Sequence, residues 1–179
     1  MSDEVPSSPG DRDPLSAACE LVGRFQYHFS KIEAALNQGV AKVLDLNDTS
    51  RDIVCANLDF IKIAIVKTAI AVQFVDSDGS LSEVLDRAVN INNPDRQMVI
   101  HSTFEPFGKD GVRFTRITAK EGRFHRHIQD WDSNKFGGLF TRMDSITEDI
   151  ERLVTTLTPY TPSLDFSDPR NSMYIGMIF

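Results

Sequence analysis

The segment INNPDRQMVIHSTFEPF, residues 91–107, contains the residues whose types and spacing first suggest chemistry. Arg96 and His101 stand in it with four residues between them. Arginine is a permanent cation with a planar fork of donors, and imidazole exchanges protons near neutral pH. The alternative is a solvated helix end, in which Arg96 pairs with Asp95 or Asp86 and His101 caps carbonyl groups.

A second set of candidates lies in GVRFTRITAKEGRFHRHIQDW. Its basic side chains are the only concentrated positive cluster of an acidic chain, so they could hold an RNA backbone, with Phe124 or Trp131 stacking on bases. A solvated hairpin face is the alternative. The basic residues are Arg113, Arg116, Lys120, Arg123 and Arg126.

Two histidines in the same stretch could form half of a metal site. His125 and His127 would share one face of a strand, and Asp130 and Asp132 are nearby. No third ligand follows at a persuasive spacing, so we expect no metal and no cofactor. The sequence also contains no glycine-rich phosphate loop, no HExxH motif and no nucleophile elbow.

Composition predicts one globular domain, because 179 residues with 41% hydrophobic and 25% charged side chains can bury a proper core. The net charge of -7 argues against a general affinity for nucleic acid or anionic membrane. Cys19 and Cys55 are expected as buried free thiols, which favours a reducing compartment and a cytoplasmic location. Residues 53–75 are apolar, but three charged residues argue against a membrane span.

The spacing of apolar residues predicts helices over the first half of the chain. The second of these is apolar nearly all round, so it belongs at the centre of a bundle or in a subunit interface. Pro94 should interrupt the third, which makes residues 95–102 a new or kinked helical piece capped by Asn92 or Asn93. The predicted helices cover residues 14–44, a stretch from the capping cluster at 47–50 to about 74, and residues 81–91.

The period then changes to that of strands. Residues 112–118 and 124–131 predict a β-hairpin around a glycine-containing turn. Ile117 does not share a face with Val112 and Phe114, so the strands should be bulged or two-sided. Two strands alone are marginal in water, and the hairpin is therefore expected to lean on the helices.

A last long helix is predicted from about residue 133 or 135 to residue 158, where Pro159 ends it. Residues 1–13 are acidic and rich in proline and serine, unlike a secretory signal, and predict a flexible N-terminal arm. Residues 159–179 form a C-terminal tail that either docks in a groove or binds a partner. The bundle domain should thus span residues 14–158.

The order of these parts resembles the HEPN superfamily, whose bundles of four or five helices carry an arginine separated from a histidine by four to six residues near the third helix. The specific part of the resemblance is RQMVIH, and Gln97 stands where the family usually has asparagine, aspartate or histidine. The resemblance implies a mainly α, four- or five-helix bundle. Here a β-hairpin is inserted between the third and last long helices.

Catalytic members of that family look like metal-independent endoribonucleases that use the ribose 2′-hydroxyl as nucleophile. By this resemblance His101 would act as general base or acid and Arg96 would hold the scissile phosphate. Family members typically dimerise with two motifs facing one cleft, so a homodimer is expected. The residues expected to contact the RNA are Gln97, Ser102, Arg113, Arg116 and Arg126.

Helix geometry limits how the motif could work. Residues five apart lie about 140° apart around a regular helix, so Arg96 and His101 converge only in a distorted helix, by the reach of Arg96, or with a second subunit. The hypothesis is a protein that cleaves or binds RNA. The alternative is a non-catalytic interaction or regulatory module that binds a protein partner, in part through the tail, or a nucleotide.

Overall fold

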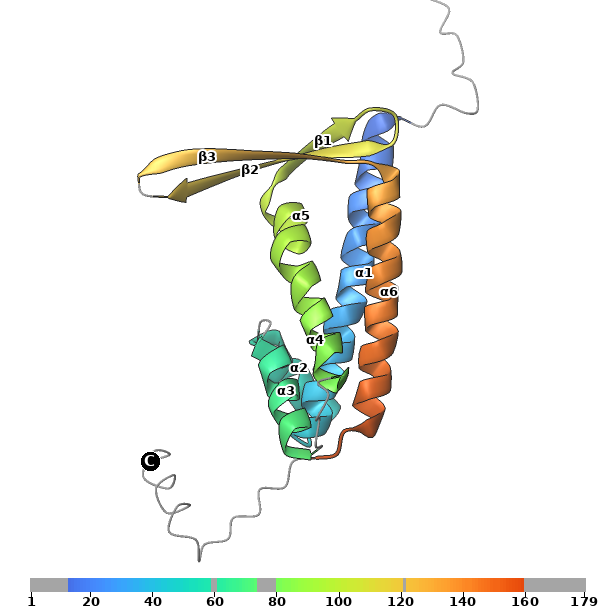
Figure 1. The fold of residues 1–179 in the computed structure, drawn as a ribbon, viewed down its shortest axis with the longest axis vertical. Coiled ribbons are helices and arrows are strands. Elements are labelled where there is room, and N and C mark those ends of the chain that lie inside the picture. The colour runs from blue at the N-terminus through green and yellow to red at the C-terminus, as the bar shows by residue number, and fades with distance from the viewer. Residues whose placement is uncertain (1–12, 59–60, 74–79, 121, 160–179) are drawn as a thin grey trace, which may run out of the picture.

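The computed structural model describes residues 13–58, 61–73, 80–120 and 122–159. The chain is mainly helical, with one small three-stranded antiparallel sheet at one end of the helices (Figure 1). The N-terminal arm and the C-terminal tail predicted from the sequence lie almost wholly outside the described residues. The elements are α1 (Pro14–Val43), α2 (Asp48–Ala56), α3 (Ile61–Gln73), α4 (Ser80–Ile91), the π-helical turn η1 (Asn92–Arg96), α5 (Gln97–His101), β1 (Thr103–Phe107), β2 (Gly111–Lys120), β3 (Arg123–Trp131) and α6 (Ser133–Thr156).

The two long helices, α1 and α6, run side by side in the same direction (Figure 1). Both begin with an aspartate cap: Asp13 accepts from the Ser16 amide at 3.0 Å, and Asp132 accepts from the Lys135 amide at 2.8 Å. The predicted bounds of both helices are confirmed to within two residues. Their apolar stripes bury Phe25, Phe29, Ile32, Leu36, Phe136, Phe140, Met143 and Ile150, among others.

The predicted second helix is wrong as a single element, because two helices, α2 and α3, occupy its place. Asn47 caps α2 by accepting from the Ser50 amide at 2.9 Å. At the other end the Asn57 side chain donates to the Ile53 carbonyl at 2.8 Å. Such local side-chain bonds compete with helix continuation, and this stretch carries few other signals of a break.

The third helix continues through Pro94 instead of stopping. Between α4 and α5 the chain makes the π-turn η1, which widens the helix around the proline. The prediction of a kinked helical piece is therefore confirmed. The predicted asparagine cap is wrong, because Ile91 and Arg96 have helical backbone angles and no side chain caps either end of the turn.

The sheet has three strands in the order β1-β2-β3, so the predicted hairpin is present and one strand was missed. β1 is an edge strand that contains Pro106. Proline in a sequence usually argues against a strand, because it lacks the N–H that pairs with a neighbouring strand, but an edge strand tolerates it. Gly111 is required where β2 starts, since a Cβ there would lie 2.7 Å from the Phe107 carbonyl oxygen and 2.9 Å from that of Trp131. The register of β2 on β3 runs without a bulge.

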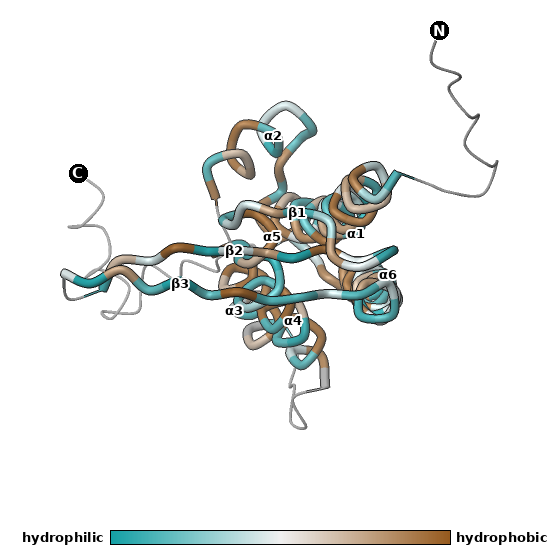
Figure 2. The backbone as a smooth tube through the Cα atoms, turned by 90° about the horizontal axis from the view of Figure 1, so that it is seen from above, coloured by the Kyte–Doolittle hydropathy of each residue, from teal (hydrophilic) through white to brown (hydrophobic). Residues whose placement is uncertain are grey.

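The hairpin packs on the helices at the end nearest the bundle, which is called its root. Val112, Phe114 and Trp131 are buried there, and the Trp131 ring packs edge-on against Phe114 and Phe136. Residues 115–120 and 122–128, called the arm below, project sideways from the bundle (Figures 1 and 2). Every residue of β3 except Trp131 is exposed. The prediction that the hairpin packs against the helices is confirmed at its root and does not extend to the arm.

Among the described residues no helix combines the length and hydrophobicity needed to cross a membrane. Cys55 is buried, as predicted, and burial raises the pKa of its thiol. Cys19 is exposed on α1, which corrects the expectation that both thiols are buried. The apolar stripe of α1 leaves this position on the solvent side.

Candidate functional site

Arg96 ends the π-turn and points toward α1. Its guanidinium carbon lies 5.0 Å from the centre of the Phe29 ring, and Nη2 lies 3.8 Å from Glu33 Oε1. A long contact of 3.5 Å joins Nη1 to Asn92 Oδ1. With 25% of its side chain exposed, Arg96 is largely occupied by interactions within the chain.

His101 is the last residue of α5 and is exposed. No hydrogen bond or ion pair joins it to Arg96 in the part of the chain that the structure describes. Arg96 belongs to the π-turn and His101 to α5, and five residues along a regular α-helix would separate the two side chains by about 140° around the axis. Catalysis by Arg96 and His101 stays a prediction.

The other two motif residues are placed by packing. Met98 and Val99 are buried against the core, and Gln97 is half-buried at the first position of α5. The Ser102 hydroxyl donates to Met98 Sδ at 3.1 Å. Among the described residues no side-chain hydrogen bond joins Gln97 or Ser102 to His101.

The arm has two chemically different faces, because residues paired across antiparallel strands share a face. Arg116 pairs with His127, Thr118 with His125 and Lys120 with Arg123. This set is called the cationic face. It continues the side of the sheet on which Val112, Phe114 and Trp131 are buried against the bundle, so it faces toward the helices.

The opposite side carries large apolar residues and is called the apolar face. Ile117 is 66% exposed, Phe124 83% and Ile128 50%. Arg126 pairs with Ile117 and so lies on this side. The sequence prediction of a two-sided hairpin is confirmed, while the predicted RNA contacts Arg116 and Arg126 are on opposite faces.

Arg113, another predicted RNA contact, is already paired. Its Nε and Nη2 donate to the two carboxylate oxygens of Asp130 at 2.7 and 2.9 Å, and its guanidinium lies 4.8 Å from the Phe107 ring centre. The hydrogen bonds from Arg113 hold the pKa of Asp130 below its usual range. Arg113 is therefore a poor donor for a ligand.

The half metal site considered from the sequence does not come together. Asp130 lies on the face opposite His125 and His127, and Asp132 caps α6. Within the described ranges no group of three His, Cys, Asp or Glu side chains is placed to hold a metal ion.

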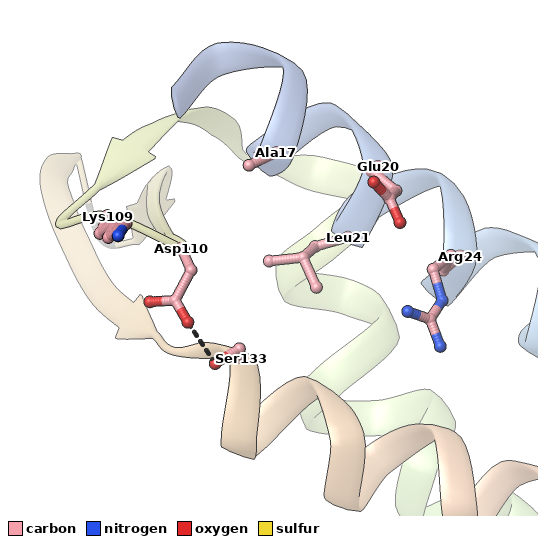
Figure 3. A pocket seen from close by; sticks show the side chains of 7 residues that line it. All are labelled: Ala17, Glu20, Leu21, Arg24, Lys109, Asp110 and Ser133. Atoms are coloured by element: carbon pink, nitrogen blue, oxygen red, sulfur yellow. Dashed lines mark hydrogen bonds between the residues drawn. The ribbon is translucent and has the colours of Figure 1, made fainter. Parts of the chain in front are cut away.

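An open cleft of about 530 Å³ lies between the start of α1, the β1–β2 turn and the start of α6 (Figure 3). Its polar lining mixes both charges: Arg24 and Lys109 stand with Glu20 and Asp110. Ser133 donates to Asp110 Oδ2 at 2.6 Å. Because carboxylates and cations share the cleft, it does not select for an anionic ligand. Sequence patterns did not predict the cleft, because its three segments are distant in the chain.

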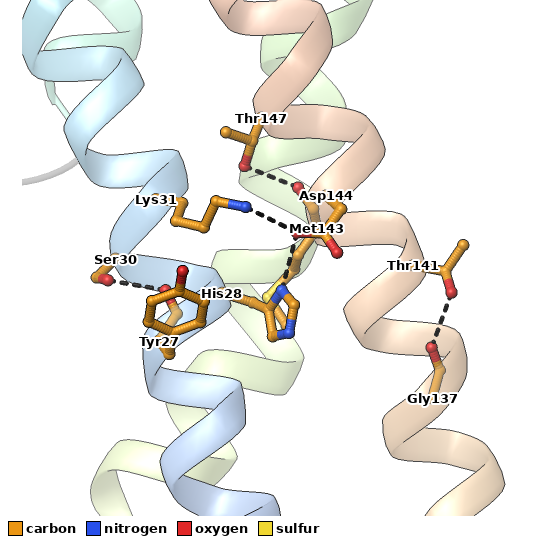
Figure 4. A network of polar contacts seen from close by, with 9 residues as sticks. All are labelled: Tyr27, His28, Ser30, Lys31, Gly137, Thr141, Met143, Asp144 and Thr147. Carbon is orange, nitrogen blue, oxygen red and sulfur yellow. Dashed lines mark hydrogen bonds and ion pairs between the residues drawn. The ribbon is translucent and has the colours of Figure 1, made fainter.

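A polar network connects the two long helices (Figure 4). Asp144 Oδ1 lies 2.9 Å from His28 Nδ1 and 3.2 Å from Lys31 Nζ, and the His28 ring stacks on Phe140 at 4.8 Å. Burial alone would raise the pKa of Asp144, but the hydrogen bonds from His28 and Lys31 outweigh it and hold the pKa below its usual range. The Ser30 hydroxyl donates to the Tyr27 carbonyl and not to His28, so the hydrogen bonds of this network serve mainly to join the two helices.

A further cluster of charged residues lies around the π-turn. Burial raises the pKa of Asp95, opposed by the charges of Lys135 and Arg142. Burial lowers the pKa of Lys135, whose ammonium lies 3.9 Å from the centre of the Trp131 ring. This places Lys135 at the root of the hairpin as a packing residue.

No protein-family model matches the chain, and no curated protein or solved structure matches it either. The resemblance to the HEPN superfamily therefore stays a prediction that rests on element order and on RQMVIH.

Proposed function

We propose that the protein binds single-stranded RNA along the helix-facing side of its arm. The observation that carries this proposal is the register of β2 on β3, which gathers Arg116, Lys120 and Arg123 on one face with His125 and His127. Between residues 115 and 128 the sequence has four arginines or lysines and one glutamate, in a chain whose net charge is -7. Positive charge is thus concentrated on an element that projects from the helices of an acidic chain (Figure 1).

The residue types of the cationic face suit RNA. Cationic side chains attract phosphates, and imidazole rings can stack on unpaired bases. Side chains two positions apart on a strand lie about 7 Å apart, so the face offers a row of donors along an extended backbone. Thr118 contacts His127 across the strands, with 3.2 Å between Oγ1 and Nε2, which helps to orient that ring.

Binding, and not cleavage, is the part of the RNA hypothesis that the geometry favours. Arg96 is turned toward Phe29 and Glu33, whereas a phosphate clamp needs a guanidinium free to face its ligand. His101 remains exposed at the end of α5, which packs against β2, so it lies near the base of the arm.

The test is fluorescence anisotropy with a labelled single-stranded RNA of mixed sequence. In the variant Arg116→Glu/Lys120→Glu/Arg123→Glu we expect affinity to fall roughly tenfold or more. The matched control reverses three exposed cations elsewhere, Lys109→Glu/Arg142→Glu/Arg152→Glu, with the same change in net charge. Equal losses in both variants would mean that only overall charge matters and would refute a site on the arm.

The same proteins test two alternatives, which are binding without selectivity for RNA and cleavage of RNA. A DNA strand of identical sequence that binds equally well would refute selectivity for RNA. Cleavage of the RNA that His101→Ala abolishes would restore the endoribonuclease hypothesis.

The apolar face favours a second candidate, a protein-binding arm. Exposed apolar groups of this size on a thin projection are typical of interaction surfaces. The variant Ile117→Ser/Phe124→Ser/Ile128→Ser should then lose a protein partner while keeping its affinity for RNA. Loss of RNA affinity in this variant would instead assign the apolar face to base stacking.

A further inference from the structure

A second surface lies at the opposite end of the bundle from the arm and is separate from the cationic face. It is an apolar groove of about 460 Å³ between the last turn of α1 and the first turns of α3. Leu44 is 45% exposed in it and Ile61 58%. The groove is lined by Val43, Leu44, Ile61, Ala64, Ile65, Thr68 and Ala69.

The one polar side chain of this lining is already satisfied. The Thr68 hydroxyl donates to the Ala64 carbonyl at 2.9 Å. The groove therefore offers apolar contact without an unpaired polar group, and it suits an apolar segment better than a charged or hydrogen-bonding ligand.

The end of α6 is fixed directly beside this groove. The Gln73 side-chain amide donates to the Thr158 carbonyl at 2.6 Å and accepts from the Thr158 amide at 2.9 Å. Lys42 donates to the carbonyls of Val154 and Thr155 at 2.7 and 2.8 Å. Gln73 lies one helical turn beyond Ala69, and Lys42 directly precedes Val43, so the chain leaves α6 next to both walls of the groove.

The chain that follows has a suitable apolar segment within reach. Residues 173–179, MYIGMIF, carry no charge, and six of the seven are hydrophobic. The fifteen residue-to-residue steps from Thr158 to Met173 can span up to roughly 50 Å, whereas the thirteen residues of α3 are only about 20 Å long. A tether of this length also gives a local concentration on the order of millimolar, which favours the chain's own tail over that of a second copy.

We propose that residues 173–179 dock in the groove between α1 and α3 of the same chain. The docked tail covers Leu44 and Ile61.

The experiment is hydrogen–deuterium exchange of the full-length chain, followed by mass spectrometry. The amides of residues 173–179 should exchange at least tenfold more slowly than in a free peptide of that sequence. Ile61→Asp should remove this protection, because a carboxylate in the groove opposes apolar docking. The matched control Ile53→Asp, at an exposed isoleucine of α2 outside the groove, should retain it.

Three results would overturn the proposal: tail amides that exchange like the free peptide, protection that Ile61→Asp leaves intact, and protection present at 50 µM protein but absent at 1 µM, which would assign the groove to another copy. If Ile61→Asp lowers the helical circular dichroism signal, the tail variant Ile175→Asp/Ile178→Asp replaces it. That variant should speed exchange in residues 61–69, and unchanged exchange there would refute docking.

Discussion

The Arg96 guanidinium lies over the ring of Phe29, with 5.0 Å between the guanidinium carbon and the ring centre. The contact joins the π-turn to α1, and Glu33 adds a charge at 3.8 Å. An arginine that looks from the sequence like a ligand for phosphate is therefore used to hold two helices together. This contact favours a structural role for Arg96, while its catalytic role stays a prediction.

Replacing Arg96 by alanine should accordingly destabilise the fold. We expect the free energy of unfolding in urea to fall by about 1–2 kcal/mol, because the cation–π contact and the packed side-chain stem are both lost. Arg142→Ala, at an exposed position of α6, should change it by less than about 0.5 kcal/mol. RNA affinity should stay within roughly twofold of wild type in a folded Arg96→Ala protein, and a large loss of affinity with unchanged stability would place the guanidinium in a binding site.

The interaction of Asp144 with His28 and Lys31 predicts a defined dependence on pH. The folded-state pKa of Asp144 lies below its unfolded value, so its contribution to stability is present above the unfolded pKa and is lost as the pH falls through the folded pKa. Asp144→Asn should therefore be less stable than wild type at pH 7, and the difference should shrink below about pH 4. Urea unfolding at pH 7 and pH 3 measures it.

The control for this prediction is Glu148→Gln, which removes an exposed carboxylate from the same helix. Its difference from wild type should be small at both pH values. A difference between wild type and Asp144→Asn that stays constant from pH 7 to pH 3 would show that the carboxylate charge does not stabilise the pair of long helices.

Two glycines give opposite predictions for the same substitution. Gly111→Ala should lower the free energy of unfolding by about 2–3 kcal/mol, because the new methyl group meets two backbone carbonyl oxygens that cannot move independently. Gly23→Ala should raise it by about 0.5–1 kcal/mol, since Gly23 lies in the middle of α1 with no atom near the added methyl. Denaturation in urea compares the two, and equal effects would contradict the close approach of β1, β2 and β3 at Gly111.

The long helices were predictable because their evidence is local and periodic. The apolar stripe from Ala18 to Val43 and that from Phe136 to Leu157 repeat every three to four residues, and an aspartate precedes each helix. The local signal for the break after Ala56 is the side chain of Asn57, which is weak within an apolar run. β1 could not be predicted because it contains Pro106, and proline is found in strands only at the edge of a sheet. Whether a strand lies at an edge depends on its partner strands, which a local sequence pattern does not specify.

The candidate site was predictable only in its residue types. The basic residues of the hairpin were identified from the sequence, but their division between two faces follows from the register, which pairs Arg116 with His127 and Ile117 with Arg126. The partner of Arg96 is a phenylalanine 67 positions away, and no local pattern specifies such a contact. The pairing of Arg113 with Asp130 likewise needs the strand alignment.

The number of cations on the arm predicts how RNA binding should respond to salt. If Arg116, Lys120 and Arg123 each neutralise one phosphate, the logarithm of the association constant should fall with the logarithm of salt concentration with a slope of about -2. Changing any one of them to alanine should reduce the magnitude of the slope by about 0.7, because one fewer phosphate is neutralised and fewer counterions leave the RNA on binding. Arg142→Ala should leave the slope unchanged, since this residue is remote from the arm on α6. Anisotropy titrations between 50 and 300 mM salt provide the slopes, and identical slopes for wild type and all three arm variants would contradict contact between the cationic face and the phosphates.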